Sequence, residues 1–175
     1  CQWVVDGLGV CTQKFDGTCC MIRDGKLFKR REQKGREIKG LGLCYEGSPP
    51  YGFELVEFDS VTGKAFGWVP VGDGPEDRWH REAVRIDGEM PWQGLPDGTY
   101  ELCGPKIQGN PEGLKVHMLI PHGYGTYLAF PRTYEGIKVA FANEWFSEGV
   151  VWHHPDGRMA KIKVRDFGLK SKAFQ

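Results

Sequence analysis

The sequence predicts an α+β fold of two antiparallel sheets with a few helices, formed by a single domain over residues 1–175. This length suits one domain with a hydrophobic core and leaves little for a second. The chain has 25 glycines, 11 prolines and 13% aromatic residues, a composition typical of a turn-rich protein in which sheet dominates. Hairpin patterns also recur along the chain, whereas only two segments have the signature of a helix.

Two hairpins are expected in the N-terminal half of the chain. Residues 18–32 alternate around Asp24-Gly25, a dipeptide that accepts positive φ at a tight turn. Residues 53–71 form a second hairpin pattern around Thr62-Gly63, rich in Phe, Val and Trp. Residues 14–17 come just before the first hairpin, and we expect them on the loop that enters its first strand.

A short helix is expected over residues 75 to about 84. Asp73 is the predicted cap, proline follows where no amide donor is needed, and acids stand at the positive end of the helix dipole. Strands are expected at residues 99–103 and 113–120. A second helix over residues 135–143 has Thr133 as its cap and apolar residues on one face.

The last predicted element is a hairpin of residues 149–154 and 159–164, joined by Pro155-Asp156-Gly157. Side chains on a strand repeat every two residues, so Lys161 and Lys163 should share one face. The apolar residues next to them should point into the core. Two ammonium groups are therefore aimed together at one site.

Charge and cysteine usage limit the partners and the compartment. Lys+Arg and Asp+Glu both number 23, so no global positive field attracts nucleic acid, and a local patch must hold any polynucleotide. Residues 23–39 are rich in cations and are either an RNA-phosphate contact or a solvated loop. The six cysteines contain no CxxC, which favours free thiols in an intracellular, cytoplasmic protein. No apolar run is long enough to span a membrane, so no membrane partner is expected.

Four motifs in order carry the functional hypothesis. Lys14-Phe15-Asp16-Gly17 alone is a weak signal, since a solvated lysine before a turn would look the same. It is followed by Tyr100-Glu101-Leu102, Glu148-Gly149-Val150-Val151 and Lys161-Ile162-Lys163. In this order and spacing the chain resembles the covalent nucleotidyltransferase superfamily of polynucleotide ligases and RNA-capping enzymes, over nearly its whole length.

Within that superfamily, the strings at residues 13–20, 29–31 and 100–105 look closest to the ATP-dependent 5′-to-3′ RNA ligase found in animals and its short microbial or viral relatives. The resemblance implies an ATP-grasp-like nucleotidyltransferase core. It also implies an enzyme that joins RNA 5′-phosphate and 3′-hydroxyl ends with ATP and Mg²⁺ or Mn²⁺, and we expect a monomer. Because the chain ends soon after Lys163, no appended oligonucleotide-binding domain is expected.

The resemblance also implies roles for individual residues. Lys14 would be the nucleophile that becomes adenylylated, and Lys161 and Lys163 would contact the phosphates. Glu148 would bind the metal, and Glu101 would contact the metal or the ribose. Either Arg30 or Arg31 would contact the ribose or an RNA phosphate. The other nucleotide-binding positions that it implies are Gln13, Asp16 and Gly17.

The chemistry explains why these residue types are wanted. Attack on the α-phosphorus of ATP needs an uncharged amine, which desolvation and the neighbouring cations Lys161 and Lys163 would favour at Lys14. The departing pyrophosphate builds negative charge, which paired lysines and a divalent cation stabilise. Carboxylates then serve as hard oxygen ligands for magnesium.

Several features depart from the pattern or favour other interpretations. Cys19 stands where many ligases have an arginine, and no base-stacking aromatic is evident near residues 116–119. A DNA ligase or a GTP-using capping guanylyltransferase would share every motif, and a non-catalytic RNA-binding module would have no need of them. Glu101 and Glu148 could be solvated strand acids. His153-His154 predicts no zinc site, because neighbours on a strand point to opposite faces.

Overall fold

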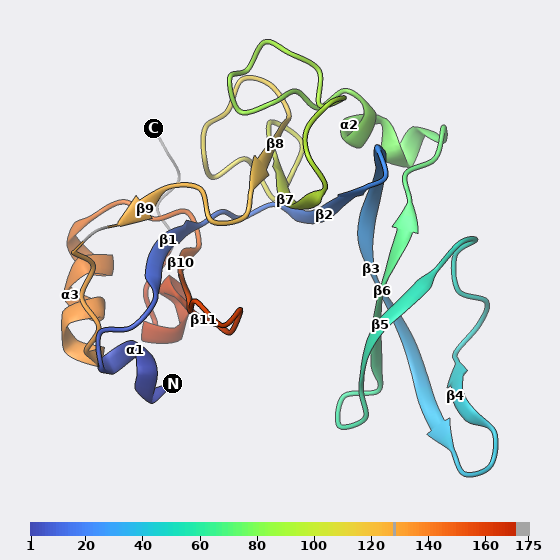
Figure 1. The fold of residues 1–175 in the computed structure, drawn as a ribbon, viewed down its shortest axis with the longest axis horizontal. Helices are drawn as coiled ribbons and strands as arrows, with labels where there is room; N and C mark the ends of the chain where they lie inside the picture. The colour runs from blue at the N-terminus through green and yellow to red at the C-terminus, as the bar shows by residue number, and fades with distance from the viewer. Residues whose placement is uncertain (128, 171–175) are drawn as a thin grey trace.

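The computed structural model describes residues 1–127 and 129–170 and has the predicted α+β class, mostly antiparallel sheet with few helices. Its two sheets lie beside each other, as Figure 1 shows. The four-stranded sheet has the order β11-β10-β1-β9. Its strands are β1 (Val10–Lys14), β9 (Thr126–Tyr127), β10 (Gly149–His153) and β11 (Met159–Lys163).

Helical segments and aromatic side chains form the core against this first sheet. The helices are α1 (Gln2–Val5), α3 (Tyr134–Asn143) and the 3-10 turn η2 (Val164–Phe167). Phe130, Phe141, Phe146 and Trp152 pack together in that core, with ring centroids about 5 to 6 Å apart. Such contacts make β1 and β10 a firm support for the residues at their ends.

The second sheet has seven strands in the order β5-β6-β3-β2-β7-β8, with β4 paired to the long strand β3. Its core holds Cys20, Ile22, Tyr100, Leu102 and Leu119. The strands are β2 (Thr18–Arg23), β3 (Lys26–Ile38), β4 (Gly42–Tyr45), β5 (Glu54–Asp59), β6 (Lys64–Pro70), β7 (Gly98–Cys103) and β8 (Met118–Pro121).

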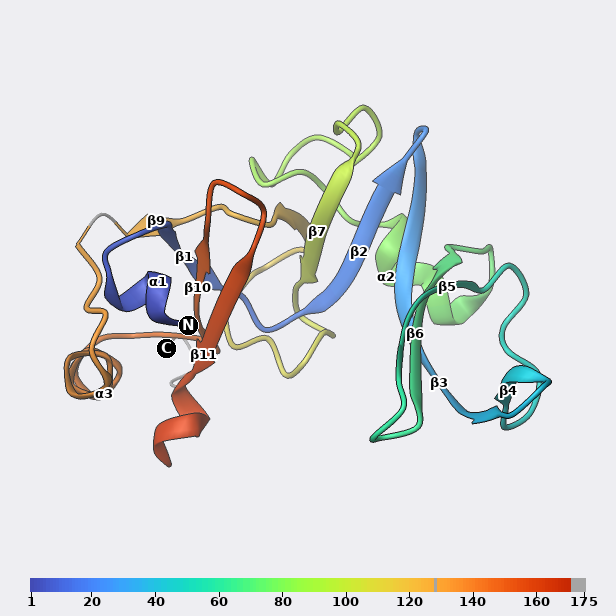
Figure 2. The same cartoon turned by 60° about the horizontal axis from the view of Figure 1, so that its bottom comes forward.

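The chain passes from one sheet to the other between β1 and β2, as Figure 2 shows in blue. Lys14 is the last residue of β1 and pairs with Gly149 of β10. The expectation that Lys14 lies on a loop was therefore wrong. Strand β1 has no local signal in the sequence because its residues do not alternate in polarity. Residues 15–17 connect β1 to β2.

The predicted hairpins are confirmed. β2 and β3 pair from Arg23 and Lys26, and both turn residues between them have positive φ, 52° at Asp24 and 68° at Gly25. The β5–β6 hairpin has the Asp59 carboxylate at its turn, where it accepts hydrogen bonds from the backbone amides of Val61 and Thr62. These turns are local, which is why a local pattern identifies them.

Two predicted elements are shorter than expected. The helix over residues 75–84 is a 3-10 turn η1 (Pro75–Asp77) followed by the single turn α2 (Arg78–Arg81), and Gly74 rather than Asp73 stands at its start. It ends early because Val84 joins the sheet, bridging to Pro91 and Met118. The strand over residues 113–120 begins only at Met118, because the Asn110 side chain holds both the amide and the carbonyl of Leu114 in a loop.

The helix over residues 135–143 and the last hairpin are confirmed. Thr133 caps α3 by accepting a hydrogen bond from the Gly136 amide, and Ile137, Ala140 and Phe141 are buried on one face. In the last hairpin Ile162 packs against the core and Val164 is buried within it. The lysines between and beside them therefore lie on the opposite face, as predicted.

Two further predictions concern thiols and membranes. All six cysteines are free thiols, as the sequence indicated. Within residues 1–127 and 129–170, no helix is both long enough and apolar enough to cross a membrane.

Candidate functional site

Lys14 lies at the end of β1, where the chain leaves the first sheet. The buried Ser147 hydroxyl donates to the Lys14 carbonyl at 3.3 Å and fixes the backbone there. The Lys14 side chain is only 19% exposed, and its Nζ donates to Glu148 Oε2. The predicted nucleophile is thus held within the protein beside a carboxylate that the sequence analysis also singled out.

Glu148 contacts residues of both the first and the last of the four motifs. Its second oxygen, Oε1, accepts a hydrogen bond from Lys163 Nζ, so one carboxylate lies between two ammonium groups. Burial by itself would raise the pKa of Glu148, but the hydrogen bonds from Lys14 and Lys163 outweigh it and hold that pKa below its usual range. Glu148 is therefore ionised at neutral pH.

Backbone geometry at the neighbouring residue makes this arrangement possible. Gly149 pairs with Lys163 across the β10–β11 ladder. A Cβ atom at Gly149 would lie 2.1 Å from the carbonyl oxygen of Ile162, so no other residue fits without a shift of the backbone. The glycine after Glu148 is thus explained by close strand packing.

A pocket of about 340 Å³ opens beside these residues and is lined from both sheets. The first sheet supplies Lys14, Val151 and Lys161, and the crossing segment, residues 15–17 between β1 and β2, supplies Phe15. Glu101 of β7 and His122, which follows β8, line the pocket from the second sheet. Within the part of the chain that the structure describes, Lys161 has no ion-pair partner. Its ammonium is consequently available to an anion in the pocket, whereas that of Lys163 is engaged by Glu148.

The crossing segment is held by two carboxylates of the second sheet's side. The Gly17 amide donates to Glu101 Oε1 at 3.1 Å, and the Asp16 amide donates to Glu112 Oε1 at 2.8 Å. A Cβ atom at Gly17 would lie 2.3 Å from the Leu102 carbonyl oxygen. The glycine of the first motif is therefore required by close contact with β7 and not by a turn.

Carboxylates cluster around this segment. Burial raises the pKa of Asp16, and the nearby Glu148 carboxylate raises it further, against the opposing effect of Lys14. Burial likewise raises the pKa of Glu112. Glu148 and Glu101 each repel Asp16 electrostatically, and a divalent cation bound by oxygen ligands would relieve that repulsion. Oxygen donors of this kind suit magnesium or manganese, and Glu148 and Glu101 are the residues that would hold such an ion.

The two candidate arginines face opposite sides of the second sheet. Cys20 pairs with Lys29, so the next residues in the register, Cys19 and Arg30, share the other face. The Arg30 charge acts on the Cys19 thiol, whereas the Arg31 charge acts on the buried His80. Cys19 also pairs with Glu101, so Arg30 is the arginine on the pocket's side.

The remaining predicted residue, Gln13, lines the pocket from β1, and its amide donates to the Gly125 carbonyl at 2.9 Å. The structure thus brings together Gln13, Lys14, Asp16, Gly17, Arg30, Glu101, Glu148, Lys161 and Lys163, and leaves Arg31 on the other face.

Sequence reasoning missed two residues of this site. Glu112 lies in an irregular loop and meets Asp16 only through the fold. His122 Nε2 lies 3.0 Å from Glu101 Oε2 and follows β8 directly. Nothing local marks either residue, because both partners are distant in the sequence. The usable signal was the predicted strand over residues 113–120, which follows the Glu101 strand along the chain and ends just before His122.

Comparison with known proteins agrees with the motif order. A family model described as RNA ligase 1 matches residues 76–173, a range that holds Glu101, Glu148, Lys161 and Lys163. RNA ligase 1 of Mus musculus is 26% identical over an alignment 224 positions long, which covers 91% of this chain and 67% of that protein.

Two shorter matches are more similar in sequence. RNA ligase 1 of Pongo abelii is 32% identical over 141 residues, covering 62% of this chain and 42% of that protein. RNA ligase 1 of Danio rerio is 32% identical over 136 residues, covering 59% of this chain and 41% of that protein. The matched stretch is therefore less than half the length of these two relatives.

Proposed function

Because the chain belongs to the RNA ligase 1 family, we propose that it is an ATP-dependent RNA ligase that works through a covalent lysyl-AMP on Lys14. It joins an RNA 5′-phosphate to a 3′-hydroxyl. The observation that carries the proposal is the contact of Lys14 and Lys163 with the two oxygens of Glu148, beside a pocket that Lys161 and Glu101 line. Three separate motifs of the sequence meet at that point.

The first step is attack by Lys14 Nζ on the α-phosphorus of ATP. A phosphorus–nitrogen bond forms and the bond to the pyrophosphate oxygen breaks, so the amine must first lose a proton. In the structure, Lys14 Nζ donates a hydrogen bond to Glu148. Attack therefore requires Glu148 to release Lys14, and the nearby cations Lys161 and Lys163 favour the neutral amine once it is released.

The pocket's other side chains position the nucleotide. Lys161 binds the phosphates with its free ammonium, and Lys163 joins it as Glu148 turns away. Glu101 Oε2 accepts from the ribose while Oε1 stays on the Gly17 amide. Phe15, Val151 and Met159 give the pocket an apolar part that suits a purine base.

Mg²⁺ or Mn²⁺ bound by Glu148, with Glu101 Oε2 as a further ligand if that oxygen does not hold the ribose, would supply positive charge against the phosphates and the departing pyrophosphate. In the second step the RNA 5′-phosphate takes the adenylyl group from Lys14. In the third, a 3′-hydroxyl attacks that 5′-phosphate and expels AMP, which seals the strand. Arg30, on the face of Cys19 and Glu101, is the residue we assign to the ribose or an RNA phosphate.

The resemblance extends the proposal to an ATP-grasp-like core in a single domain that acts as a monomer in the cytoplasm. These points stay predictions, as does the use of the basic residues 23–39 to contact RNA. Sedimentation of the purified protein with and without RNA measures both the monomer state and RNA binding.

Incubation with α-labelled ATP and Mg²⁺ tests the central claim. We expect covalent label on the wild-type protein that is stable to alkali and released by acid, as a phosphoramidate is. Lys14→Ala should carry no label, and the matched control Lys138→Ala, a lysine of helix α3 remote from the pocket, should carry undiminished label. Label on Lys14→Ala equal to that on the wild type would overturn the proposal.

Two further arms separate the rival activities. A capping guanylyltransferase would be labelled by α-labelled GTP in preference to ATP, and a DNA ligase would seal nicked DNA in preference to nicked RNA. A non-catalytic RNA-binding module would bind RNA equally well as wild type and Lys14→Ala, with no label on either. We expect ATP and RNA to be preferred.

A further inference from the structure

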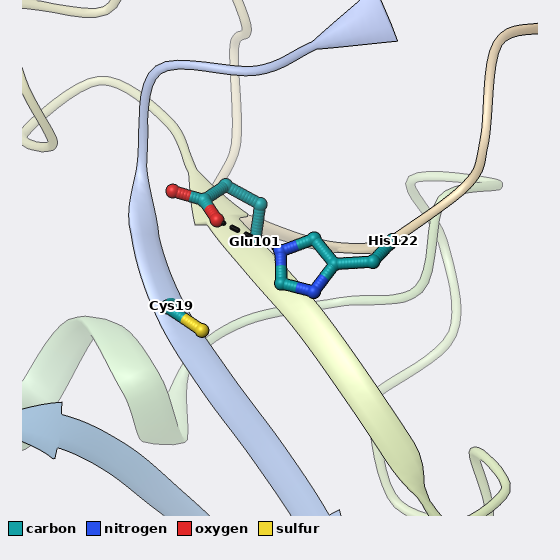
Figure 3. Close-up of side chains that lie close together, drawn as sticks. All are labelled: Cys19, Glu101 and His122. Atoms are coloured by element: carbon teal, nitrogen blue, oxygen red, sulfur yellow. Dashed lines mark hydrogen bonds and ion pairs between the residues drawn. The ribbon is translucent and has the colours of Figure 1, made fainter. Parts of the chain in front are cut away.

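Cys19, Glu101 and His122 bring three different metal-ligating groups together beside the pocket. One ligand atom of each, the Cys19 thiol sulfur, a Glu101 carboxylate oxygen and a His122 ring nitrogen, lies within 4.8 Å of the other two. Figure 3 shows the thiol and the imidazole on the same side of β7, with a dashed line joining Glu101 to His122. The three groups come from two neighbouring strands and the segment that follows a third.

Strand pairing within the second sheet places these three residues next to one another. Cys19 of β2 pairs directly with Glu101 of β7, so their side chains point to the same face. The His122 amide donates to the Thr99 carbonyl at 3.1 Å and anchors the end of β8 against β7. Side chains held by strand register need little rearrangement to act together.

We propose that Cys19, Glu101 and His122 form a binding site for a thiophilic divalent cation of the zinc class, with one coordination position left open towards the pocket. Sulfur, nitrogen and one carboxylate oxygen are the ligands that such ions take, and three protein ligands leave room for a water or a substrate atom. Magnesium prefers an all-oxygen set. This site therefore differs in chemistry from the magnesium position proposed at Glu148, although Glu101 is a candidate ligand of both.

The geometry needs only a small adjustment. Zinc–sulfur and zinc–nitrogen bonds of about 2.3 and 2.0 Å put tetrahedral ligand atoms roughly 3.3 to 3.6 Å apart. Glu101 Oε2 and His122 Nε2 are already 3.0 Å apart, and the His122 side chain is 37% exposed. Glu101 Oε1 remains on the Gly17 amide, so Oε2 is the oxygen that the cation would take.

Binding of the cation requires the Cys19 thiol to lose its proton, and it affects the proposed nucleotide site. Burial, followed by the Glu101 carboxylate, raises the pKa of Cys19 to about 11, so the cation must displace the thiol proton and binds better at pH 8 than at pH 6. A cation on Glu101 Oε2 also removes the oxygen that we assign to the ribose. Resting on the proposed function, we therefore expect zinc to inhibit self-adenylylation in competition with ATP.

Titration of the metal-free full chain with Co²⁺ at pH 8, followed by absorption spectroscopy, tests the site without any enzyme assay. We expect a thiolate-to-cobalt charge-transfer band and visible d–d bands of tetrahedral intensity, saturating at one Co²⁺ per chain. Zn²⁺ should abolish these bands by competition, whereas an excess of Mg²⁺ should leave them unchanged.

Two variants test individual ligands, and a third serves as the control. Cys19→Ser should lose the charge-transfer band, and His122→Ala should weaken Co²⁺ binding at least tenfold. Cys44→Ser, a free cysteine on β4 far from the cluster, should bind as the wild type does. Circular dichroism verifies that each variant is folded. Absence of the band from the wild type, or its persistence in Cys19→Ser, would overturn the proposal, and neither result bears on whether Lys14 takes a nucleotide.

Discussion

Gly149 pairs with Lys163 across the last hairpin, and this register sets the Lys163 ammonium beside the carboxylate of the residue before Gly149. The same Gly149 pairs with Lys14 on its other side. One glycine therefore aligns the nucleophile strand and the cation strand on either side of Glu148. The glycine of the Glu-Gly-Val-Val motif is as much a part of the site as the charged residues.

Gly149→Ala should disturb the site through the backbone alone. Its Cβ would meet the Ile162 carbonyl at 2.1 Å, so β10 and β11 must separate. Overpacking of this kind costs about 1–3 kcal/mol. We expect a lower melting temperature and a loss of self-adenylylation larger than the fraction of unfolded protein explains. Wild-type labelling by a folded Gly149→Ala protein would show that the register does not matter.

Lys161 and Lys163 should differ in their effect on stability although both serve the reaction. Losing one charged contact to the phosphates costs about 1.5–3 kcal/mol, so either alanine variant should slow self-adenylylation by roughly tenfold to a hundredfold. Of these two variants, only Lys163→Ala should shift the melting temperature, because Lys163 pairs with Glu148 and Lys161 does not. Thermal melts beside labelling rates measure both effects, and equal melts for the two variants would contradict the assignment.

The sequence could predict the features that depend on residues close together along the chain, and it could not predict those that depend on contacts between distant segments. The hairpin around Asp24-Gly25 and the common face of Lys161 and Lys163 follow from local alternation and turn chemistry, and both are confirmed. The motif order brought Lys14 and Glu148 into one hypothesis, and they are in contact. Order alone did not reveal that Lys14 ends a strand, since β1 is defined by its pairing with β10.

Other features depend on contacts that no local pattern encodes. Glu112 holds the Asp16 amide from 96 residues away, and His122 meets Glu101 across a strand pair. Choosing Arg30 over Arg31 required the register of β2 with β3, because adjacent strand residues always face opposite ways. The helix expected to reach residue 84 ends at Arg81, because Val84 forms β-bridges with Pro91 and Met118. In that helix, tertiary pairing overrode local propensity.

The buried ion pair of Lys29 and Asp77 should govern stability away from the pocket. Both side chains are at least nine-tenths buried, and Asp77 also accepts from the Gly72 amide at 2.7 Å. Lys29→Met would leave a buried carboxylate without its cation, at a cost of about 3–5 kcal/mol. Adding Asp77→Asn should recover most of the loss, because the amide oxygen keeps the Gly72 contact without a charge. Urea unfolding of the single and double variants measures this.

The pH dependence of that pair has a definite sign. Burial alone would raise the pKa of Asp77, but the Lys29 and Gly72 hydrogen bonds lower it below 3.8. The pair therefore stabilises the wild type above pH 3.8, and this contribution is lost as pH falls through the lower folded pKa. In Lys29→Met the carboxyl is protonated more easily. The stability gap between wild type and Lys29→Met should narrow from pH 7 to pH 4, and a constant gap would contradict the buried pairing.

Arg30 and Arg31 give the last prediction, because they are neighbours with opposite surroundings. Arg30 shares the face of Cys19 and Glu101, so Arg30→Ala should raise the KM for ATP or RNA by roughly tenfold, the effect of one lost charged hydrogen bond. Arg31 lies near the buried His80 on the other face, so Arg31→Ala should leave both KM values within about twofold. Steady-state ligation with each substrate varied in turn measures the two constants. A larger KM effect for Arg31→Ala would reverse the assignment and place the ribose or RNA contact on the opposite face of the second sheet.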